Sequence, residues 1–506
     1  MKQFRKPTPK YTNLISILVL MAFVLNACQP AYPSSLDLWI DNSEDEVTET
    51  PLPELTPVAT RPSYLPGTIV DYVAQSGDTV PALAIHFNTT VAEIREANPI
   101  IPEDATTMPP GMPMKIPIYY DPIWSSSYQI IPDIAFVNGP RGVDFDVVEF
   151  VNQHPGWLKD SRHIIGEEVR SGAGMIIYIS EMFSVSPQLL LAILEYQTGA
   201  LSNSTPPDDV DAYPLGYREI FHQGVAQQLV WAANFLNNGY YTWRDGSLKT
   251  YKHSDGRLER PDPWQNAAST ALQYYFSQIM GRDEYALAVS ANGLAHTYAA
   301  LFGDPWQGDL NLIPGSLRQP EMILPFAPGQ TWAYTGGPHT GWGLGAPFSA
   351  IDFAPATNVG GCTPAIDPAL AVADGVISRK GIAFAVLDLD GDGDERTGWS
   401  VFYLHLLTTS IPPVGTQLKQ GDPIGLPSCE GGKSTGTHVH IARKYNGEWI
   451  LAGDIVPFNM EGWITGIGNA AYSGTMKKNG LVKTACVCSD QFSQITAQGL
   501  SVVADQ

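Results

Sequence analysis

The most informative stretch of the chain is Thr437-His438-Val439-His440-Ile441-Ala442-Arg443. Alternate residues of a β-strand share one face, so a strand here would present His438 and His440 on the same side. Short runs of Val and Ile between Gly, Pro and aromatic residues fill the last third of the chain and indicate β-structure. His339, Asp352 and His405 precede this stretch. Imidazole and carboxylate groups are ligands that zinc prefers, so the sequence predicts a zinc site on a sheet.

The order of these residues resembles the lysostaphin/LytM-type zinc endopeptidases. The resemblance covers roughly residues 325–475 and rests on Gly-Gly-Pro-His339, Asp352, Tyr403-Leu-His405-Leu and His438-Val-His440. The wide spacing between His339 and Asp352 is similar to that of the beta-lytic branch. The resemblance implies an antiparallel all-β domain that binds Zn²⁺ and hydrolyses peptide cross-links of peptidoglycan. A folded but inactive member of the family is the alternative.

The resemblance also implies a role for each polar side chain. His339, Asp352 and His440 would bind zinc, and His405 and His438 would be the unliganded catalytic histidines. Such imidazoles can take a proton from water and return it to a leaving amine. Strand alternation further places Tyr403 on the same face as His405.

An acidic cluster lies between two of these motifs. Its carboxylates occupy alternate positions, at Asp388, Asp390, Asp392 and Asp394. A glycine follows the third of them. Hard oxygen ligands in this arrangement are typical of the first half of a Ca²⁺-binding loop. Trp399 stands where an EF-hand would close with glutamate, so a solvated acidic hairpin remains the alternative.

The N-terminus is typical of an exported protein. Basic residues precede an apolar run at 14–25, and the sequence Leu25-Asn26-Ala27-Cys28 resembles a lipobox. Residues 1–28 are therefore interpreted as a lipoprotein signal peptide with Cys28 as the lipid attachment site. A simple membrane anchor is the alternative. The Pro-rich, acidic composition of residues 29–66 predicts a linker.

Four cysteines remain after Cys28, an even number that makes disulfides plausible outside the cytosol. They are Cys362, Cys429, Cys486 and Cys488. The pair Cys362–Cys429 is predicted as one bridge. Zinc–thiolate binding is the competing interpretation, but Cys486-Val-Cys488 lacks the usual two-residue spacer.

Residues 67–119 predict a strand, two amphipathic helices and a last strand. Asp78 or Thr79 would cap the first helix. The segment resembles a LysM module, which implies binding of N-acetylglucosamine-containing glycans such as peptidoglycan, although a generic small α+β domain is the alternative. The residues proposed to contact glycan are Gly77, Asp78, Thr79, Asn98 and Pro99.

Residues 120–320 read as mostly helical, with helical apolar spacing at 164–183, 186–196 and 225–236. The segment around 184–199 resembles a lysozyme-like lytic transglycosylase, but Gln197 stands where that family has its acid. Because an amide cannot donate a titratable proton, the domain is predicted to be non-catalytic. Glu195 would face another way on the helix. The aromatic stretch 239–243 could stack on sugars or pack internally.

The chain is thus predicted to be multidomain, with a small α+β domain, a mostly α domain, an all-β zinc peptidase domain at 321–490 and a tail at 491–506. The net charge of -22 argues against a nucleic-acid partner. We expect an extracytoplasmic lipoprotein, anchored in a membrane, whose partner is peptidoglycan. A non-catalytic wall-binding regulator and a transglycosylase acting through the middle domain are the rival functions.

Overall fold

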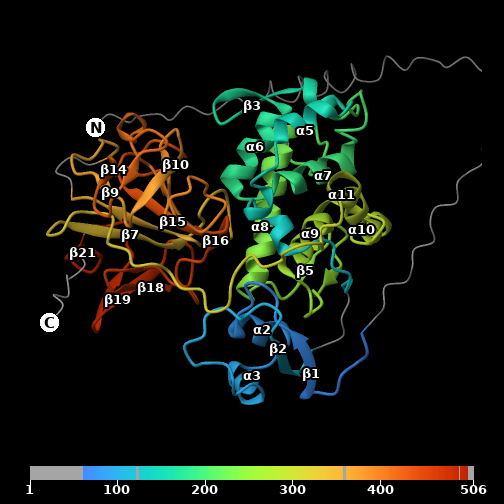
Figure 1. The fold of residues 1–506 in the computed structure, drawn as a ribbon, viewed down its shortest axis with the longest axis horizontal. Coiled ribbons are helices and arrows are strands. Elements are labelled where there is room, and N and C mark those ends of the chain that lie inside the picture. The colour runs from blue at the N-terminus through green and yellow to red at the C-terminus, as the bar shows by residue number, and fades with distance from the viewer. Residues whose placement is uncertain (1–60, 121–124, 357–360, 489, 500–506) are drawn as a thin grey trace, which may run out of the picture. The chain divides into compact units, whose positions relative to one another are not determined.

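The computed structural model describes residues 61–120, 125–356, 361–488 and 490–499 (Figure 1). The predicted signal peptide, Cys28 and most of the predicted linker lie outside these residues. Within the described ranges, every helix is too short or too polar to cross a lipid bilayer.

The first described module has the four elements that the sequence predicts. They are β1 (Thr68–Val73), α2 (Val80–His86), α3 (Val91–Ala97) and β2 (Pro113–Ile118). The two strands pair antiparallel, and the side chain of Thr79 caps α2 by accepting from the Ala82 amide at 3.3 Å. Thr90 and Glu93 form a capping box at the start of α3, which stabilises a helix of only seven residues. Its identity as a LysM module stays a prediction.

The middle region is mostly helical, as predicted. Its α-helices are α4 (Asp133–Phe136), α5 (Val147–Gln153), α6 (Gly172–Phe183), α7 (Pro187–Thr198), α8 (Val225–Arg244), α9 (Ala267–Ile279), α10 (Arg282–Ala288) and α11 (Leu294–Phe302). Three 3₁₀ turns join them, η1 (Pro140–Gly142), η2 (Trp157–Asp160) and η3 (Ile220–His222). Two short hairpins complete the region, β3 (Arg162–Ile165) with β4 (Glu168–Ser171), and β5 (Tyr251–Lys252) with β6 (Leu258–Glu259).

One helix begins later than the sequence predicts. Residues 164–171 have apolar spacing compatible with a helix, but they form most of the β3–β4 hairpin. Gly166 and Glu167 both have positive φ, at 60° and 64°, as the tight turn of a two-residue hairpin requires. The helix α6 therefore starts at Gly172, where the side chain of Ser171 accepts from the Gly174 amide.

The last third is an antiparallel β-region, which confirms the predicted all-β class. Its main sheet has the order β13-β10-β11-β12-β15-β8-β7-β21, with β16 paired to β15. These strands are β7 (Thr331–His339), β8 (Ala350–Ala354), β10 (Gly375–Gly381), β11 (Phe384–Asp388), β12 (Trp399–Leu404), β13 (Gln417–Leu418), β15 (Val439–Tyr445), β16 (Glu448–Ile450) and β21 (Gln494–Thr496). The sheet thus extends past residue 490, where the sequence places a tail.

Smaller elements flank the main sheet. They are the pair β9 (Ala369–Leu370) and β14 (Pro423–Gly425), the turn η4 (Thr408–Ser410), and a four-stranded sheet of β17 (Asn459–Met460), β18 (Trp463–Ile467), β19 (Gly474–Lys478) and β20 (Leu481–Thr484). The main sheet has a hydrophobic core on each face. One includes Ile351, Tyr403 and Ile441, and the other, continuous with the core of the helical region, includes Phe402 and Ala442.

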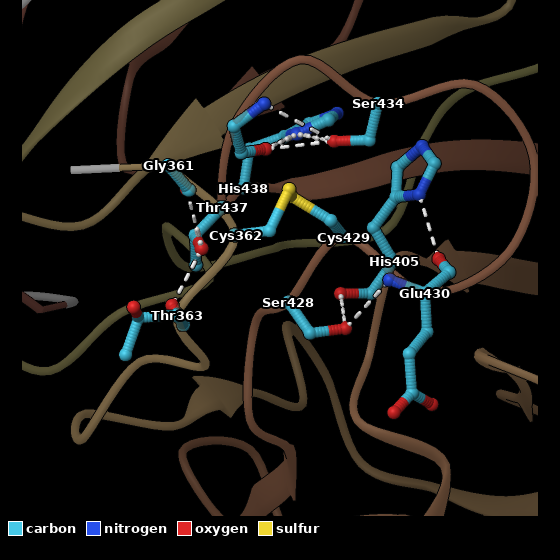
Figure 2. The surroundings of a disulfide bond; sticks show 11 residues. Gly361, Cys362, Thr363, His405, Ser428, Cys429, Glu430, Ser434, Thr437 and His438 are labelled. Atoms are coloured by element: carbon cyan, nitrogen blue, oxygen red, sulfur yellow. Dashed lines mark hydrogen bonds between the residues drawn. A yellow bond between two sulfur atoms is a disulfide. The ribbon is translucent and has the colours of Figure 1, made fainter.

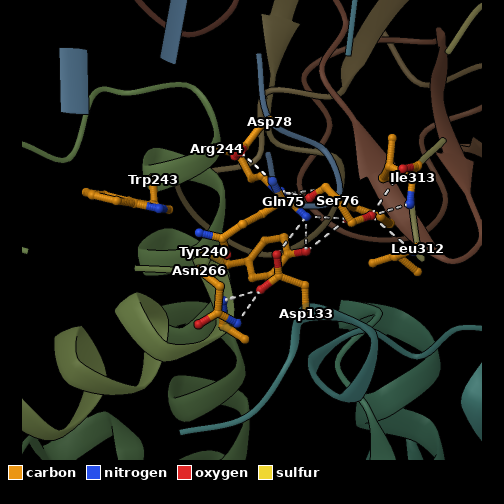
Figure 3. Close-up of polar contacts among 12 residues, drawn as sticks. Gln75, Ser76, Asp78, Asp133, Tyr240, Trp243, Arg244, Asn266, Leu312 and Ile313 are labelled. Atoms are coloured by element: carbon orange, nitrogen blue, oxygen red, sulfur yellow. Dashed lines mark hydrogen bonds and ion pairs between the residues drawn. The ribbon is translucent and has the colours of Figure 1, made fainter. Parts of the chain in front are cut away.

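Arg244, at the end of α8, has partners in all three regions, and Figure 3 shows it beside Ser76, Tyr240 and Asp133. Its guanidinium donates to the Ser76 carbonyl and, at 2.9 Å, to the Tyr240 hydroxyl. It also pairs with Asp133 at 3.1 Å and with Glu448 of β16 at 3.1 Å. The buried guanidinium therefore has carboxylate partners from two regions, which offset the cost of burying its charge.

A second buried ion pair joins β10 to the loop before β12. Arg379 and Lys444 both contact Glu395, the latter at 3.1 Å. Burial alone would raise the pKa of Glu395, but the charges of Arg379 and Lys444 outweigh it and hold this pKa at about 2. Burial lowers the pKa of Lys444 although Glu395 acts to raise it, whereas Glu395 outweighs burial and raises the pKa of Arg379. We therefore assign the stabilisation of the Glu395 carboxylate chiefly to Arg379.

This pair predicts a specific acid sensitivity. A carboxyl group with a depressed folded-state pKa stabilises the fold above its ordinary pKa of 4.5 and loses that contribution as the pH falls towards 2. The contribution is about 3 kcal/mol. We expect the thermal midpoint to fall more steeply over this pH window in the native protein than in Glu395→Gln. Parallel pH profiles in circular dichroism melts would contradict the assignment.

Candidate metal centre

Three neighbouring strands place His339, Asp352 and His440 together. His339 is the last residue of β7, Asp352 lies within β8, and His440 is the second residue of β15. His440 pairs directly with Asp352 across the antiparallel ladder. All three side chains are buried, at 2–5% exposed. Strand register therefore fixes the site without any contribution from a long loop.

The three potential ligand atoms lie close to one another. His339 Nε2 is 3.0 Å from His440 Nδ1 and 3.3 Å from Asp352 Oδ1, and His440 Nδ1 is 3.4 Å from the same oxygen. Ligands of a tetrahedral zinc at about 2.0–2.1 Å lie roughly 3.3–3.4 Å from one another. The described residues offer no hydrogen-bond donor to the buried Asp352 Oδ1. These three atoms fit a zinc ion.

Backbone carbonyls orient both imidazoles for this purpose. His339 Nδ1 lies 2.8 Å from the Gly337 carbonyl, and His440 Nε2 lies 3.2 Å from the Gly341 carbonyl. A carbonyl only accepts, so each of these ring nitrogens carries the proton. The other nitrogen of each ring, which faces Asp352, then has a free lone pair. Such outer hydrogen bonds are the usual way in which proteins fix metal-binding tautomers.

The electrostatics favour an ionised carboxylate at Asp352. Burial alone would raise the pKa of Asp352, but His339, followed by His440 and His438, holds this pKa well below its usual range. In turn, burial acts to lower the pKa of His339, and the Asp352 carboxylate outweighs it and raises this pKa. Protons and a cation therefore compete for the same atoms, so metal affinity should fall at acid pH.

Gly336 leaves room for the Asp352 carboxylate. A Cβ atom at this position would lie 2.3 Å from Asp352 Oδ2 and 2.8 Å from its Cγ. We expect Gly336→Ala to displace the carboxylate and to weaken zinc binding about 10–100-fold, as loss of a supporting contact does. Competition with a chromogenic zinc chelator measures this affinity.

Gly436→Ala is the matched control for this prediction. A Cβ atom there has only the Gly361 carbonyl near it, at 3.9 Å. Zinc affinity should stay near that of the native protein. Equal affinities in the Gly336 and Gly436 variants would contradict the proposed geometry.

His405 and His438 lie beside the three candidate ligand residues, with the ring centroids of His405 and His440 6.2 Å apart. Their ring centroids are 4.5 Å apart, and His438 Nε2 is 3.9 Å from Asp352 Oδ2. The predicted common face of Tyr403 and His405 is wrong. Tyr403 is buried in the opposite core, where its hydroxyl accepts from the Val372 amide. The two side chains do not share a face because His405 follows the end of β12 with a left-handed φ of 64°, which redirects the His405 side chain.

The disulfide Cys362–Cys429 supports both histidines and confirms the predicted pairing (Figure 2). On one side of the bond, the Glu430 carbonyl accepts from His405 Nδ1 at 2.9 Å. On the other side, Thr437, next to His438, donates to the carbonyls of Gly361 and Thr363. Cys486 and Cys488 are bonded to each other.

Hydrogen bonding leaves Nε2 of both histidines available. His438 Nδ1 lies 2.7 Å from the Gly436 carbonyl. His405 Nδ1 likewise lies 2.9 Å from the Glu430 carbonyl. Burial, with smaller effects of His438 and His440, lowers the pKa of His405 to about 4. His405 is therefore neutral at pH 7 and can accept a proton at Nε2.

Two further residues of the site carry no sequence signal. The ring of Tyr472 stacks on His339 with a centroid distance of 4.1 Å. Glu430 lies beside His405, and its carboxylate accepts from the Thr408 amide and hydroxyl. Only the approach of the smaller sheet brings Tyr472 to His339, so no spacing rule could identify it.

The acidic cluster is partly assembled. Asp388, Asp390 and Asp392 each offer one carboxylate oxygen, and these atoms lie within 4.8 Å of one another. Burial, followed by the influence of Asp390 and Asp392, raises the pKa of Asp388 to about 7. The carboxylate of Asp394 instead pairs with Arg396 at 2.6 Å, so its prediction as a fourth member is wrong.

The structure does not leave most of the predicted glycan contacts free. A Cβ atom at Gly77 would lie 2.5 Å from Arg244 Nη1, so this turn is covered. Asp78 accepts from the Tyr72 hydroxyl and the Gln75 amide, both at 2.7 Å, and Asn98 exchanges hydrogen bonds with the Lys115 backbone. These three residues thus have contacts within the protein, and glycan binding by this module stays a prediction. Thr79 caps α2, and Pro99 is exposed.

The residues singled out in the helical region have structural contacts. Gln197 donates to the Leu215 carbonyl and accepts from the Tyr275 hydroxyl. Glu195 faces another way, as predicted, and accepts from the amides of Leu201 and Ser202. In the stretch 239–243, the aromatic residues are buried, which favours packing over sugar stacking.

The helical region, and a longer part of the chain that exceeds it, are similar to known proteins. Residues 129–316 match the family model described as "LasA, N-terminal domain". The chain is 26% identical over 293 residues to Protease LasA of Pseudomonas aeruginosa (strain UCBPP-PA14). This match covers 54% of the chain and 65% of the relative, so the chain spans less than two thirds of the curated protein.

Solved structures of M23 peptidases are also similar. The M23 metalloprotease pseudoalterin is 24% identical, with a TM-score of 0.29, and the match covers 33% of the chain and 96% of that protein. The catalytic domain of lysostaphin from Staphylococcus simulans is 24% identical, with a TM-score of 0.18, covering 24% of the chain and 89% of that domain.

Proposed function

We propose that the chain is a zinc-dependent endopeptidase that hydrolyses peptide cross-links of peptidoglycan. The observation that carries the proposal is the triad of His339, Asp352 and His440, whose ligand atoms lie 3.0–3.4 Å apart in metal-binding tautomers. Two further histidines beside this triad supply acid–base groups. The similarity to Protease LasA, itself called a protease, supports the same class of reaction.

The residues divide into a metal-binding set and a proton-transfer set. When bound, zinc supplies Lewis acidity that polarises a peptide carbonyl and lowers the pKa of water. His405, neutral at pH 7, can accept the proton of the attacking water at Nε2. His438, whose Nε2 faces the same space, can donate to the developing oxyanion or to the leaving amine when it is protonated.

The location and target of the enzyme form part of the proposal. The lipobox-like sequence at Cys28 supports a membrane-anchored lipoprotein at the extracytoplasmic face of the envelope. The βααβ module at 68–118 supports glycan binding of the LysM kind, with Gly77, Asp78 and Asn98 engaged in contacts within the protein. Exposed Pro99 and Ile100 remain at its free surface. The middle region is proposed to be non-catalytic because Gln197 and Glu195 have structural partners.

Purified protein tests the proposal through its metal dependence. The zinc-loaded protein should solubilise purified peptidoglycan, the protein stripped by a chelator should not, and added zinc should restore activity. Persistence of activity in fully stripped protein would contradict the proposal. A zinc-binding protein without activity on any peptidoglycan would favour the wall-binding regulator instead.

A further inference from the structure

The loop between β11 and β12 brings three carboxylates together, at a place distinct from the zinc ligands. Asp388 ends β11, and Asp390 and Asp392 follow in the loop. Their carboxylate oxygens lie within 4.8 Å of one another. Calcium binds oxygen at about 2.3–2.6 Å, so two of its ligands can be separated by up to roughly 5 Å. The cluster has dimensions suited to a single calcium ion.

One buried carboxylate oxygen of this cluster has no hydrogen-bond partner among the described residues. Asp388 is fully buried, and its Oδ2 accepts from the amides of Gly391 and Gly393 at 3.1 and 2.9 Å. Its Oδ1 is buried too, and none of the described residues donates a hydrogen bond to it. A buried carboxylate oxygen without a donor is costly, and a neighbouring carboxylate relieves it only when one of the two is protonated. A bound cation satisfies it while all three carboxylates stay ionised.

We propose that this loop binds one Ca²⁺ through Asp388, Asp390 and Asp392. The ligands occupy alternate positions, and Gly393, with a φ of 86°, follows the third of them, as the sharp turn of a calcium loop requires. Oxygen-only ligands favour Ca²⁺ over Zn²⁺. Because Trp399 replaces the closing glutamate of an EF-hand, we expect weak binding, with a Kd on the order of 10⁻⁴–10⁻³ M.

Calcium at this position would stabilise the contact between the β-region and the helical region. Later in the same loop, Arg396 donates to the carbonyls of Gly142 at 2.8 Å and Val143 at 3.3 Å. Glu395, between the two parts of the loop, pairs with Arg379 of β10. The cation would order the first half of the loop, and these ion pairs and hydrogen bonds order the second half.

Terbium luminescence tests the proposal directly on the full zinc-loaded protein. Tb³⁺ replaces Ca²⁺ at oxygen sites, and Trp399 can sensitise it because Trp399 adjoins Ser400, the residue paired with Asp388. We expect Tb³⁺ emission that saturates at one ion per chain, is displaced by millimolar Ca²⁺ and is largely lost in Trp399→Phe. Without Tb³⁺, Ca²⁺ at ten times its Kd should raise the thermal midpoint by roughly 1.5 °C.

Paired variants within the loop make the test specific. Asp390→Ala, at an exposed position, should weaken Ca²⁺ binding at least tenfold without unfolding the protein. Asp394→Ala removes the same charge four residues later in the loop but should leave Ca²⁺ affinity nearly unchanged, because the Asp394 side chain pairs with Arg396. Absence of saturable binding up to 10 mM Ca²⁺, or equal affinities in both variants, would overturn the proposal. Neither readout depends on peptidase activity.

Discussion

Replacement of His440 by alanine is expected to remove zinc from the protein and to abolish peptide hydrolysis. His440 Nδ1 is one of the three proposed ligand atoms in a buried site, and its loss leaves only His339 and Asp352. Two protein ligands hold zinc poorly, since catalytic sites use three. We expect zinc content, measured by plasma mass spectrometry after gel filtration, to fall from about one ion per chain to near zero, and activity to fall by ~10³-fold or more.

His296→Ala is the matched control for His440→Ala. His296 is exposed on α11, in the helical region. Its replacement should leave zinc content and activity unchanged. Circular dichroism melts of both variants separate loss of the ligand from loss of the fold. Full zinc content in a folded His440→Ala protein would show that another residue is the ligand.

The variants His405→Ala and His438→Ala are expected to keep zinc but to lose most of their activity. Neither ring lies among the three ligand atoms, and the Nδ1 atoms of both are held by backbone carbonyls. Positioned acid–base groups typically contribute 10²–10⁴-fold to a rate, so kcat should fall by about that factor in each variant. The measurement is kcat on a defined cross-linked peptide together with zinc content.

The double variant His405→Ala/His438→Ala distinguishes joint from independent action. If one proton path uses both rings, the double variant should lose little more activity than the worse single variant. Native activity in either single variant would remove that histidine from the mechanism. Loss of zinc from either variant would mean that it binds the metal.

The candidate zinc site could be predicted because its side chains stand at strand positions. Period-two alternation places His440 on one face, and the pairing with Asp352 follows from sheet register. The same rule fails for His405, since a left-handed φ at the strand end reverses its direction. Tyr472 was missed because tertiary packing alone brings it to His339.

Two further features of the structure could not be read from the sequence. Gly77 and Asp78 suit an exposed turn, but Arg244, more than 160 residues away along the chain, packs over Gly77. Residues 164–171 have helical apolar spacing, but the Gly166–Glu167 turn makes a hairpin instead. The element order of the 67–119 module could be predicted because caps and turns are local signals.

Mass spectrometry of digested peptidoglycan tests the central claim most directly. Purified sacculi are incubated with the zinc-loaded protein, with chelator-treated protein and with the His440→Ala variant, and the soluble fragments are sequenced. The account predicts new amino and carboxyl termini within the cross-linking peptides, intact glycan strands, and no release by the two controls. Anhydro-sugar or reducing sugar ends on uncleaved peptides would contradict it and would assign the activity to the helical region.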